Sequence, residues 1–408
     1  ILIKFLLFFY IFYFLNFMES EKLLAEAEFQ KKSKIRLIIL LPILAILLAL
    51  TICFIVLYIQ EKNKTDGTDN KTDSPINGDN SDSSGNDKHN YHGYIPLPSW
   101  NDGTAKKSLS DFIAKINSAE YYVPKEDRIA VFDLDGTLYQ ETDPTYDDWK
   151  LYYWRVYNDS TFQSTDEQKK IADDILKVSQ DNIMPDDLNL RIANTYTQLF
   201  INFTIEEYQQ YIIDFTSKPA EGYTNMTRGG AFFKPMLELI EYIQKNDFNV
   251  YITSGTDRYQ VRTVVKGHID IPDCNVIGSE YDIVAKNQGD KKGNDYTYQK
   301  DDDFRFNGAF LRKNLKTNKV IGIIREIGKQ PILSFGNSGG DKDMANYVIN
   351  KNKHPSLAFM VCCDDTERER GNLKSAEDMK KNCETYGWVP ISMKNDWKTI
   401  YGDNVKKK

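Results

Sequence analysis

Two aspartates directly follow a short apolar run in the segment Arg128–Leu138, which reads RIAVFDLDGTL. Because residues i and i+2 of an extended chain project to the same side, Asp133 and Asp135 can share one site. Gly136, which has no Cβ, lets the backbone turn sharply after them. Two carboxylates this close repel each other unless a cation lies between them. The pattern therefore predicts a divalent metal with oxygen ligands, for which the hard ion Mg²⁺ fits best.

Two structural alternatives use the same residues. An Asp-Gly pair after a strand is typical of a hairpin turn, and Asp-x-Asp is typical of a calcium-binding loop. The calcium loop requires glycine at its sixth position, which is Leu138 here. A hairpin requires a second alternating strand at once, whereas the next residues are polar and then helix-like. Both alternatives are therefore disfavoured.

A second polar strand end lies further along the chain. Apolar residues on one face predict a helix over 236–244, and the sequence FNVYIT predicts a strand over 248–253. Ser254 and Gly255 follow this strand, at the position where open α/β sheets bind ligands. The Ser254 hydroxyl and the Gly255 N–H could donate to a phosphate oxygen. A polar strand-to-helix turn explains the pair equally well.

A third strand end is rich in glycine. Residues 319–327 predict a helix, and Pro331–Phe335 predicts a strand that runs into the sequence GNSGGD. Asn337 and Asp341 in that sequence provide oxygen ligands, as the first strand end does. Lys319 lies at the start of the helix, where its charge opposes the helix dipole. This lysine is therefore either solvated or functional.

In this order the segments resemble the four motifs of the haloacid dehalogenase superfamily of phosphohydrolases, over residues 106–405. DLDGT is similar to the first motif, Asp-x-Asp-x-Thr, Ser254 to the Ser/Thr of the second, and Lys319 to the lysine of the third. GNSGGD is similar to the fourth motif, Gly-Asp-x-x-x-Asp, except that Asn337 replaces the first acid. The resemblance implies an α/β fold with a three-layer, Rossmann-like parallel sheet.

The stretch from about 140 to 230 resembles the inserted helical cap of the phosphoserine-phosphatase-like branch. Two capping boxes, Ser164 with Glu167 and Thr204 with Glu207, predict helix starts there. Aromatic side chains of the cap could form a pocket for a small phosphomonoester, including a cationic one. Packing between helices is the alternative role for most of these aromatic residues.

The resemblance implies a role for each motif residue. Asp133 would attack phosphorus to form an aspartyl-phosphate, and Asp135 would protonate the leaving alcohol and then activate water. Mg²⁺, Lys319 and Ser254 would offset the charge of the phosphoryl oxygens. The implied metal ligands are Asp133, the Asp135 carbonyl, Asn337 and Asp341. The expected substrate contacts are Thr137, Gly255 and Arg258, with Arg228 as a further candidate.

Two motif positions discriminate between functions. Asp135 favours a phosphatase over a dehalogenase, which lacks an acid there. The Asn337 amide can still ligate Mg²⁺, but the site carries one negative charge less, so weaker Mg²⁺ binding is expected. The alternative function is a cell-surface binding protein on a phosphatase fold. Loss of Asp133 or Lys319 would favour that alternative, and both are present.

The remaining sequence predicts a membrane protein. The formal charge of −7 and the pI near 5.4 argue against nucleic acid as a partner. An uncharged apolar run covers residues 37–59, and its length of about 35 Å suffices for a hydrocarbon core of about 30 Å. Basic residues precede the run, so segment 1–36 is expected in the cytosol and the rest in the lumen or outside the cell. The run is too long for a signal peptide and is expected to be an uncleaved signal-anchor.

Residues 60–100 are polar and are expected to form a disordered stalk before a domain over 101–408. Residues 1–17, which precede Met18, are expected not to be translated. An oxidising compartment would allow a disulfide between Cys383 and either Cys362 or Cys363. The adjacent Cys362 and Cys363 are expected to end a strand and not to bind zinc, because no histidine or second cysteine pair lies at ligand spacing. The same compartment would also allow glycosylation at the sequons of Asn63, Asn70, Asn158, Asn202 and Asn225.

Overall fold

The computed structural model describes residues 97–141, 145–181 and 184–408. The predicted membrane segment 37–59, the segment before it and nearly all of the predicted stalk lie outside these residues. Within the described ranges, no helix is long and apolar enough to cross a membrane.

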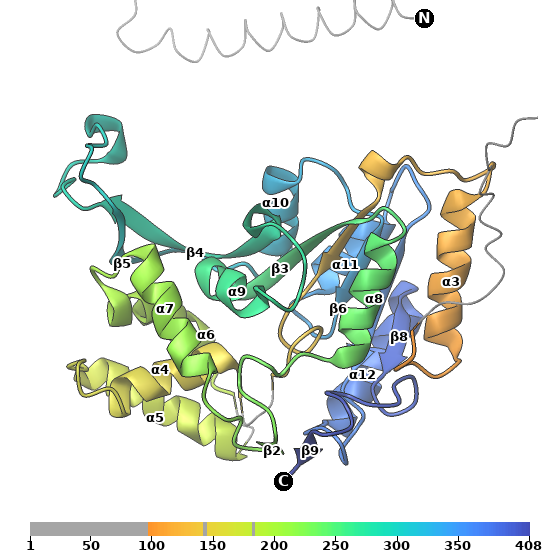
Figure 1. Ribbon diagram of the computed structural model, residues 1–408, viewed down its shortest axis with the longest axis horizontal. Helices are drawn as coiled ribbons and strands as arrows, with labels where there is room; N and C mark the ends of the chain where they lie inside the picture. Colours follow the sequence, from red (N-terminus) through yellow and green to blue (C-terminus); the bar gives the residue numbers. More distant parts are fainter. Residues whose placement is uncertain (1–96, 142–144, 182–183) are drawn as a thin grey trace, which may run out of the picture. The chain divides into compact units, whose positions relative to one another are not determined.

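A seven-stranded sheet forms the centre of the described chain (Figure 1). The strand order is β5-β4-β3-β1-β6-β7-β8, and all neighbours are parallel except β4 and β5. Strand β1 (IAVF) is fully buried, as expected for a strand covered on both faces. The strands are β1 (Ile129–Phe132), β3 (Asn249–Asp257), β4 (Val276–Ala285), β5 (Phe304–Arg312), β6 (Leu333–Gly336), β7 (Leu357–Cys362) and β8 (Val389–Ser392), with β2 (Tyr223–Thr224) and β9 (Lys406–Lys407) in a separate antiparallel pair.

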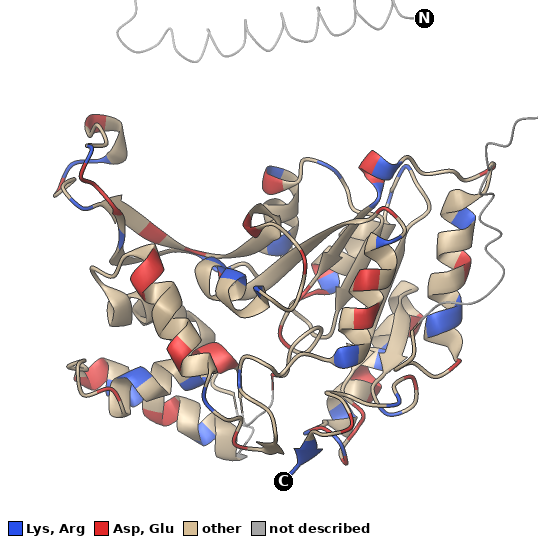
Figure 2. Cartoon of the chain, viewed as in Figure 1, with Lys and Arg blue, Asp and Glu red and all other residues tan. Residues whose placement is uncertain are grey.

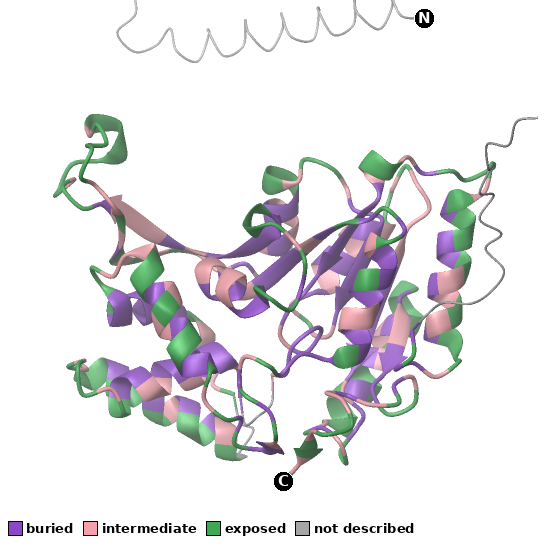
Figure 3. Cartoon of the chain, viewed as in Figure 1, coloured by how far each residue is buried: buried purple, intermediate pink, exposed green. Residues whose placement is uncertain are grey.

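Helices cover both faces of the sheet (Figures 1 and 3), so the core has three layers. Val131 of β1 packs with Ile323 and Met344 on one face. Phe132, on the other face, belongs to the main apolar cluster, which also contains Leu109 of α3 and Leu239 of α8. The helices are α3 (Thr104–Asn117), α4 (Asp147–Tyr157), α5 (Asp166–Asp181), α6 (Leu188–Tyr196), α7 (Ile205–Thr216), α8 (Lys234–Gln244), α9 (Arg258–Val265), α10 (Thr317–Glu326), α11 (Lys342–Ile349) and α12 (Leu373–Tyr386). The predicted α/β architecture with a mostly parallel sheet is confirmed.

Three phenylalanines fix the centre of one sheet face. Phe132, Phe335 and Phe359 are directly opposite one another on β1, β6 and β7. Their rings stack with centroids 4.4 and 4.9 Å apart. Each such pair contributes about 0.5–1.5 kcal/mol beyond the burial of its area. The stack holds the ends of β1 and β6 in register, and the predicted site lies there.

Helices α4 to α7 lie between β1 and β3 in sequence and form a group beside the sheet (Figure 1). The predicted capping box of Thr204 and Glu207 is confirmed at the start of α7. The other predicted box, at Ser164, is wrong by one residue. Thr165 and Gln168 form it instead, because α5 begins directly after Thr165.

The hairpin of β4 and β5 was not predicted. Tyr281 of β4 stacks on Tyr196 with ring centroids 5.9 Å apart, and Phe306 of β5 meets Tyr208 edge to face at 5.0 Å. The hairpin therefore connects the sheet to α6 and α7. The loop at its tip, residues 286–303, is rich in charged residues and largely exposed (Figures 2 and 3).

The predicted disulfide is wrong in this structure. All four cysteines of the described residues are free, namely Cys274, Cys362, Cys363 and Cys383. Cys362 and Cys383 are buried in an apolar cluster between β7 and α12, together with Met360 and Met379. The cysteines there pack as small apolar side chains, and Cys362 ends β7 as the alternative interpretation predicted.

Candidate active site at the strand ends

The first motif begins where β1 ends, at the centre of the sheet. The N–H of Asp133 donates to the carbonyl oxygen of Phe335 at 2.9 Å, which extends the pairing of β1 with β6 by one residue. Only 6% of Asp133 is exposed. Because β1 lies between β3 and β6, the carboxyl ends of these three strands meet around Asp133.

Lys319 connects two of the predicted carboxylates. Its Nζ lies 2.5 Å from Asp133 Oδ1 and 2.6 Å from Asp341 Oδ1, and all three side chains are buried. Burial lowers the pKa of Lys319, but the effect of the two carboxylates is larger and raises the pKa to about 12. Burial and the Asp341 charge raise the pKa of Asp133, which Lys319 opposes. The lysine is therefore a charged, buried partner of the candidate nucleophile and not a solvated residue.

Asp135 is held by a residue of β3. Its Oδ2 accepts a hydrogen bond from Thr256 Oγ1 at 2.9 Å. Burial raises the pKa of Asp135 to about 8, and the nearby Asp148 and Asp133 carboxylates add to this shift. With its pKa raised in this way, Asp135 can hold a proton near neutral pH, which is what a general acid requires.

The turn after Asp135 requires glycine, as predicted. Gly136 has φ +76°, and its N–H donates to the Tyr139 carbonyl at 2.6 Å. A Cβ at this position would lie 1.9 Å from Asn337 Nδ2 and 2.6 Å from Glu141 Oε2. Any side chain would therefore strain the backbone and displace both neighbours.

Thr137 and Asn337 lie beside the Asp133 carboxylate. Thr137 Oγ1 is 3.4 Å from Asp133 Oδ2 and 3.4 Å from Asn337 Oδ1. Oxygens from the first and fourth motifs thus converge on one hydroxyl. The structure brings both predicted residues to the Asp133 carboxylate.

Asp341 shapes the loop after β6. Its Oδ2 accepts the N–H groups of Asn337 and Ser338 and the Ser338 hydroxyl, at 3.0–3.1 Å. Its Oδ1 accepts Lys319. Asp341 therefore orients both the lysine and the loop, and its direct ligation of a metal stays a prediction.

Ser254 and Gly255 are within β3 and not beyond it, because this strand is longer than predicted. Ser254 is fully buried, and its Oγ accepts the N–H of Thr256 at 3.1 Å. The carbonyl of Gly255 accepts the Ser279 hydroxyl at 2.6 Å. Their contacts with phosphate stay predictions, whereas Thr256 is the β3 residue that touches the acid.

The two candidate arginines are engaged elsewhere. Arg258 pairs with Glu280 and Glu326, at 3.3 and 2.6 Å. Arg228 pairs with Glu221 at 3.0 Å. Their charges are thus balanced by these glutamates, and a role as phosphate anchors would require each to leave its partner.

Three residues of the site were missed from the sequence. Thr256 lies two positions after Ser254 and therefore on the same side of the strand, which is a signal that could have found it. Glu141 lies against Asn337, and burial raises its pKa to about 8. Asp148, in the first turn of α4, is buried and acts on Asp135. Glu141 and Asp148 come from a stretch whose folding back onto the strand ends has no local sequence signal.

The donor set is consistent with Mg²⁺. The side-chain oxygens next to Thr137 are one carboxylate and one amide, and the Asp135 carbonyl is two residues from Asp133. Mg²⁺ prefers oxygen ligands and retains several waters, so one or two protein carboxylates suffice. Among the described residues, no group of three His, Cys, Asp or Glu side chains is arranged to hold a metal.

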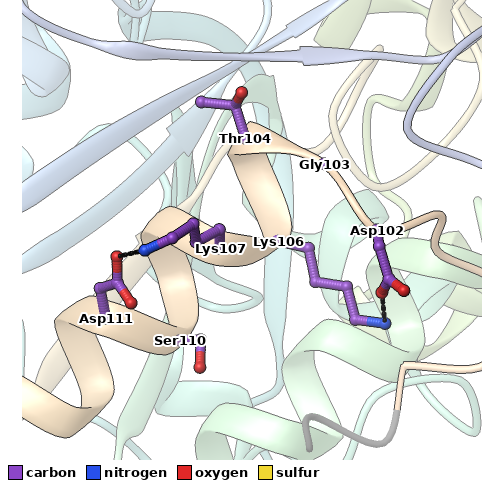
Figure 4. A pocket seen from close by; sticks show the side chains of 7 residues that line it. All are labelled: Asp102, Gly103, Thr104, Lys106, Lys107, Ser110 and Asp111. Carbon is purple, nitrogen blue, oxygen red and sulfur yellow. Dashed lines mark hydrogen bonds and ion pairs between the residues drawn. The ribbon is translucent and has the colours of Figure 1, made fainter. Parts of the chain in front are cut away.

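A surface hollow at the start of α3 is lined by residues between Asp102 and Asp111 and is separate from the candidate site (Figure 4). Its lysines are paired locally, Lys106 with Asp102 at 2.9 Å and Lys107 with Asp111 at 2.5 Å. The hollow contains none of the predicted catalytic residues, and its charges are balanced.

Neither a protein-family model nor a curated protein matches the sequence. Distantly similar solved structures include the following three. A functionally unknown protein from Anaerococcus prevotii has a TM-score of 0.43 and 15% identity, over 71% of this chain and 91% of that one. Cytosolic 5′-nucleotidase IIIB bound to cytidine has a TM-score of 0.41 and 12% identity, over 71% of this chain and 84% of that one. A phosphoserine phosphohydrolase-like protein from Francisella tularensis has a TM-score of 0.32 and 13% identity, over 62% of this chain and 92% of that one.

Proposed function

We propose that this chain hydrolyses small phosphomonoesters through an aspartyl-phosphate on Asp133. The observation that carries the proposal is the contact of Lys319 with Asp133 and Asp341, residues 186 and 22 positions away in sequence. Burying an ammonium between two carboxylates costs free energy, because each charge loses its hydration, so a functional role is expected for this arrangement. In that role, the Lys319 ammonium would stabilise the negative charge of phosphoryl oxygens bound to Asp133.

In the first step, an Asp133 oxygen forms a bond to phosphorus while the bond from phosphorus to the ester oxygen breaks. Asp135 gives its proton to that oxygen, which leaves as an alcohol. The raised pKa of Asp135, about 8, keeps this proton available at neutral pH. Thr256 holds the carboxyl in place through its hydroxyl.

In the second step, Asp135 is a carboxylate and takes a proton from water. The water oxygen attacks phosphorus, the bond from phosphorus to Asp133 breaks, and inorganic phosphate leaves. Lys319 stays beside the Asp133 oxygen throughout and offsets negative charge there. Bound beside Asp133 and Asn337, Mg²⁺ would supply further charge stabilisation for the phosphoryl oxygens.

Hydrolysis of p-nitrophenyl phosphate by the purified full chain tests the proposal. We expect turnover that requires Mg²⁺ and falls at least about a thousandfold in Asp133→Asn, since the amide is a poor nucleophile. Turnover without a metal, or activity that survives the substitution, contradicts the mechanism. Absence of turnover across a panel of phosphomonoesters would favour the alternative of a binding protein on this fold.

We also propose that segment 37–59 anchors the chain with its catalytic domain in the lumen or outside the cell. The described sequon residues Asn158, Asn202 and Asn225 are all exposed, as glycan acceptors must be. The test is a mobility shift of the expressed chain on treatment with an endoglycosidase. No shift, together with protease sensitivity of the domain from the cytosolic side, would refute this orientation.

A further inference from the structure

The fourth motif lacks an acid at Asn337, and Glu141 lies directly against that residue. The side-chain nitrogen of Asn337 and a carboxylate oxygen of Glu141 lie next to each other beside Gly136, and the amide lowers the pKa of Glu141 against the larger effect of burial. Both groups lie over Gly136, where a Cβ would be 1.9 Å from Asn337 Nδ2 and 2.6 Å from Glu141 Oε2. The bare glycine is therefore what allows the amide and the carboxylate to meet.

This contact fixes the orientation of the amide. The nitrogen of Asn337 is the amide atom on the side of Glu141, since Nδ2 and Glu141 Oε2 both lie beside the Cβ position of Gly136. Its oxygen then faces the other way, 3.4 Å from Thr137 Oγ1, which is also 3.4 Å from Asp133 Oδ2. The Asn337 oxygen is thus aimed at the side of the nucleophile where metal ligands are expected.

The charges around Glu141 are acidic. The charged groups acting on its carboxylate are those of Asp135, Asp133 and Asp341. When these groups are ionised, a fourth carboxylate raises the negative potential of the site, which favours the binding of a cation. Lys319 is already shared by Asp133 and Asp341.

We propose that Glu141 replaces the acid missing at Asn337 and acts as a positioning residue for Mg²⁺. It orients the amide oxygen toward the ion, draws electron density to that oxygen through the N–H donor, and adds a negative charge one hydrogen bond away from the ion. Such outer contacts to a ligand typically change metal affinity by about 10–100-fold. The inference rests on the proposed function, which requires Mg²⁺ beside Asp133.

Titration calorimetry of Mg²⁺ into the full chain, without substrate, tests the proposal. In Glu141→Gln we expect Mg²⁺ to bind about tenfold or more weakly. The double variant Glu141→Gln/Asn337→Asp exchanges the acid and the amide between the two positions. The introduced amide then donates to the introduced carboxylate, which contacts the ion directly, so the double variant should recover at least the wild-type affinity. A merely structural role of Glu141 would not be rescued by this exchange.

The matched control is Glu126→Gln, which removes the same charge at an exposed position near the opposite end of β1. It should leave the Mg²⁺ affinity unchanged. If Glu141→Gln does not fold, the double variant and Glu141→Asp, which keeps the charge, are compared with the wild type. Unchanged affinity in Glu141→Gln, a double variant as weak as the single one, or a wild type that binds no Mg²⁺ would each overturn the proposal.

Turnover of p-nitrophenyl phosphate by the same proteins separates this inference from the proposed function. If affinities follow the expected pattern but no protein turns over substrate, the metal inference stands and the phosphatase proposal fails. If the wild type shows Mg²⁺-dependent turnover but Glu141→Gln binds Mg²⁺ normally, the phosphatase proposal stands and the role of Glu141 is wrong.

Discussion

At the scale of single residues, Lys319 shows how burial decides between two interpretations. At the start of α10 its charge opposes the helix dipole, and the sequence left open whether it is solvated or functional. The side chain is about 1% exposed and lies between two carboxylates. Spacing in sequence could not show this, because the partners come from β1 and from the loop after β6.

Thr256 contacts Asp135, although the motif pointed to the nearby Ser254 as the functional residue of this strand. Ser254 is similar to the second-motif Ser/Thr, yet its Oγ accepts a local N–H bond from Thr256. Because β3 continues to Asp257, Thr256 reaches further along the strand toward Asp135. The contact of Ser254 with phosphate stays a prediction, and the later end of the strand adds Thr256 as the residue of β3 that holds Asp135.

The first prediction concerns the hydrogen bond from Thr256 to Asp135. This bond stabilises the carboxylate and so lowers the pKa of Asp135. In Thr256→Val the pKa should rise, the basic limb of the pH profile of kcat should move up by roughly half to one unit, and kcat should fall about tenfold. Thr256→Ser, which keeps the hydroxyl, should restore both. An unmoved basic limb in the valine variant, or a serine variant that behaves like it, contradicts this role.

At the scale of elements, the predicted helices and strands that carry motifs are present, with shifted ends. The helix predicted over 236–244 is α8, and the strand predicted over Pro331–Phe335 is β6, which begins two residues later. Periodicity and glycine positions suffice for such local features. The antiparallel β5 was missed because its exposed and half-buried pattern depends on contacts with distant helices.

The second prediction concerns Asp257, the N-cap of α9. Its Oδ1 accepts the N–H groups of Tyr259 and Gln260, both at 2.9 Å, whereas Oδ2 is buried and has no partner among the described residues. Burial raises the pKa of Asp257 to about 7. The folded chain therefore holds a proton that the unfolded chain releases near pH 4. This group stabilises the fold at low pH, and that stability is lost as the pH rises from about 4 through about 7.

Asp257→Asn keeps the capping oxygen and removes the titration. The wild type loses stability from pH 5 to pH 8 and the variant does not. The free energy of unfolding of the variant, relative to that of the wild type, should therefore be about 1–3 kcal/mol higher at pH 8 than at pH 5, since one pKa unit corresponds to about 1.4 kcal/mol. Asp257→Ala should be about 1 kcal/mol less stable than Asp257→Asn at both pH values, because both variants lack the titrating group and only the alanine variant lacks the cap. Urea unfolding at the two pH values measures these differences. Parallel pH profiles for the wild type and Asp257→Asn would contradict the argument.

At the scale of the whole molecule, the order of motifs along the chain predicted the mostly parallel sheet. It did not predict that Asp148 of α4 and Glu141 would lie at the strand ends. These placements depend on the packing of α4 to α7 as a group, through aromatic contacts such as Tyr196 with Tyr281. Local sequence does not encode which face of an inserted helical group meets the core.

The last prediction follows from the accumulation of buried carboxyls at the strand ends. Burial raises the pKa of Asp133 to about 7 and those of Asp135 and Glu141 to about 8. Unfolded carboxyls titrate near pH 4, so between about pH 4 and pH 8 the folded chain binds more protons than the unfolded chain. Its stability must therefore fall as the pH rises over this range.

Mg²⁺ binds the deprotonated form of the site and should offset this loss. In a chelator we expect the full chain to have a Tm several degrees lower at pH 8 than at pH 5. Millimolar Mg²⁺ should raise the Tm clearly at pH 8 and little at pH 5, where protons occupy the carboxyls. The measurement is best made in Asp257→Asn, because Asp257 titrates in the same window. An equal Mg²⁺ effect at both pH values would show that the ion does not compete with these protons and binds elsewhere.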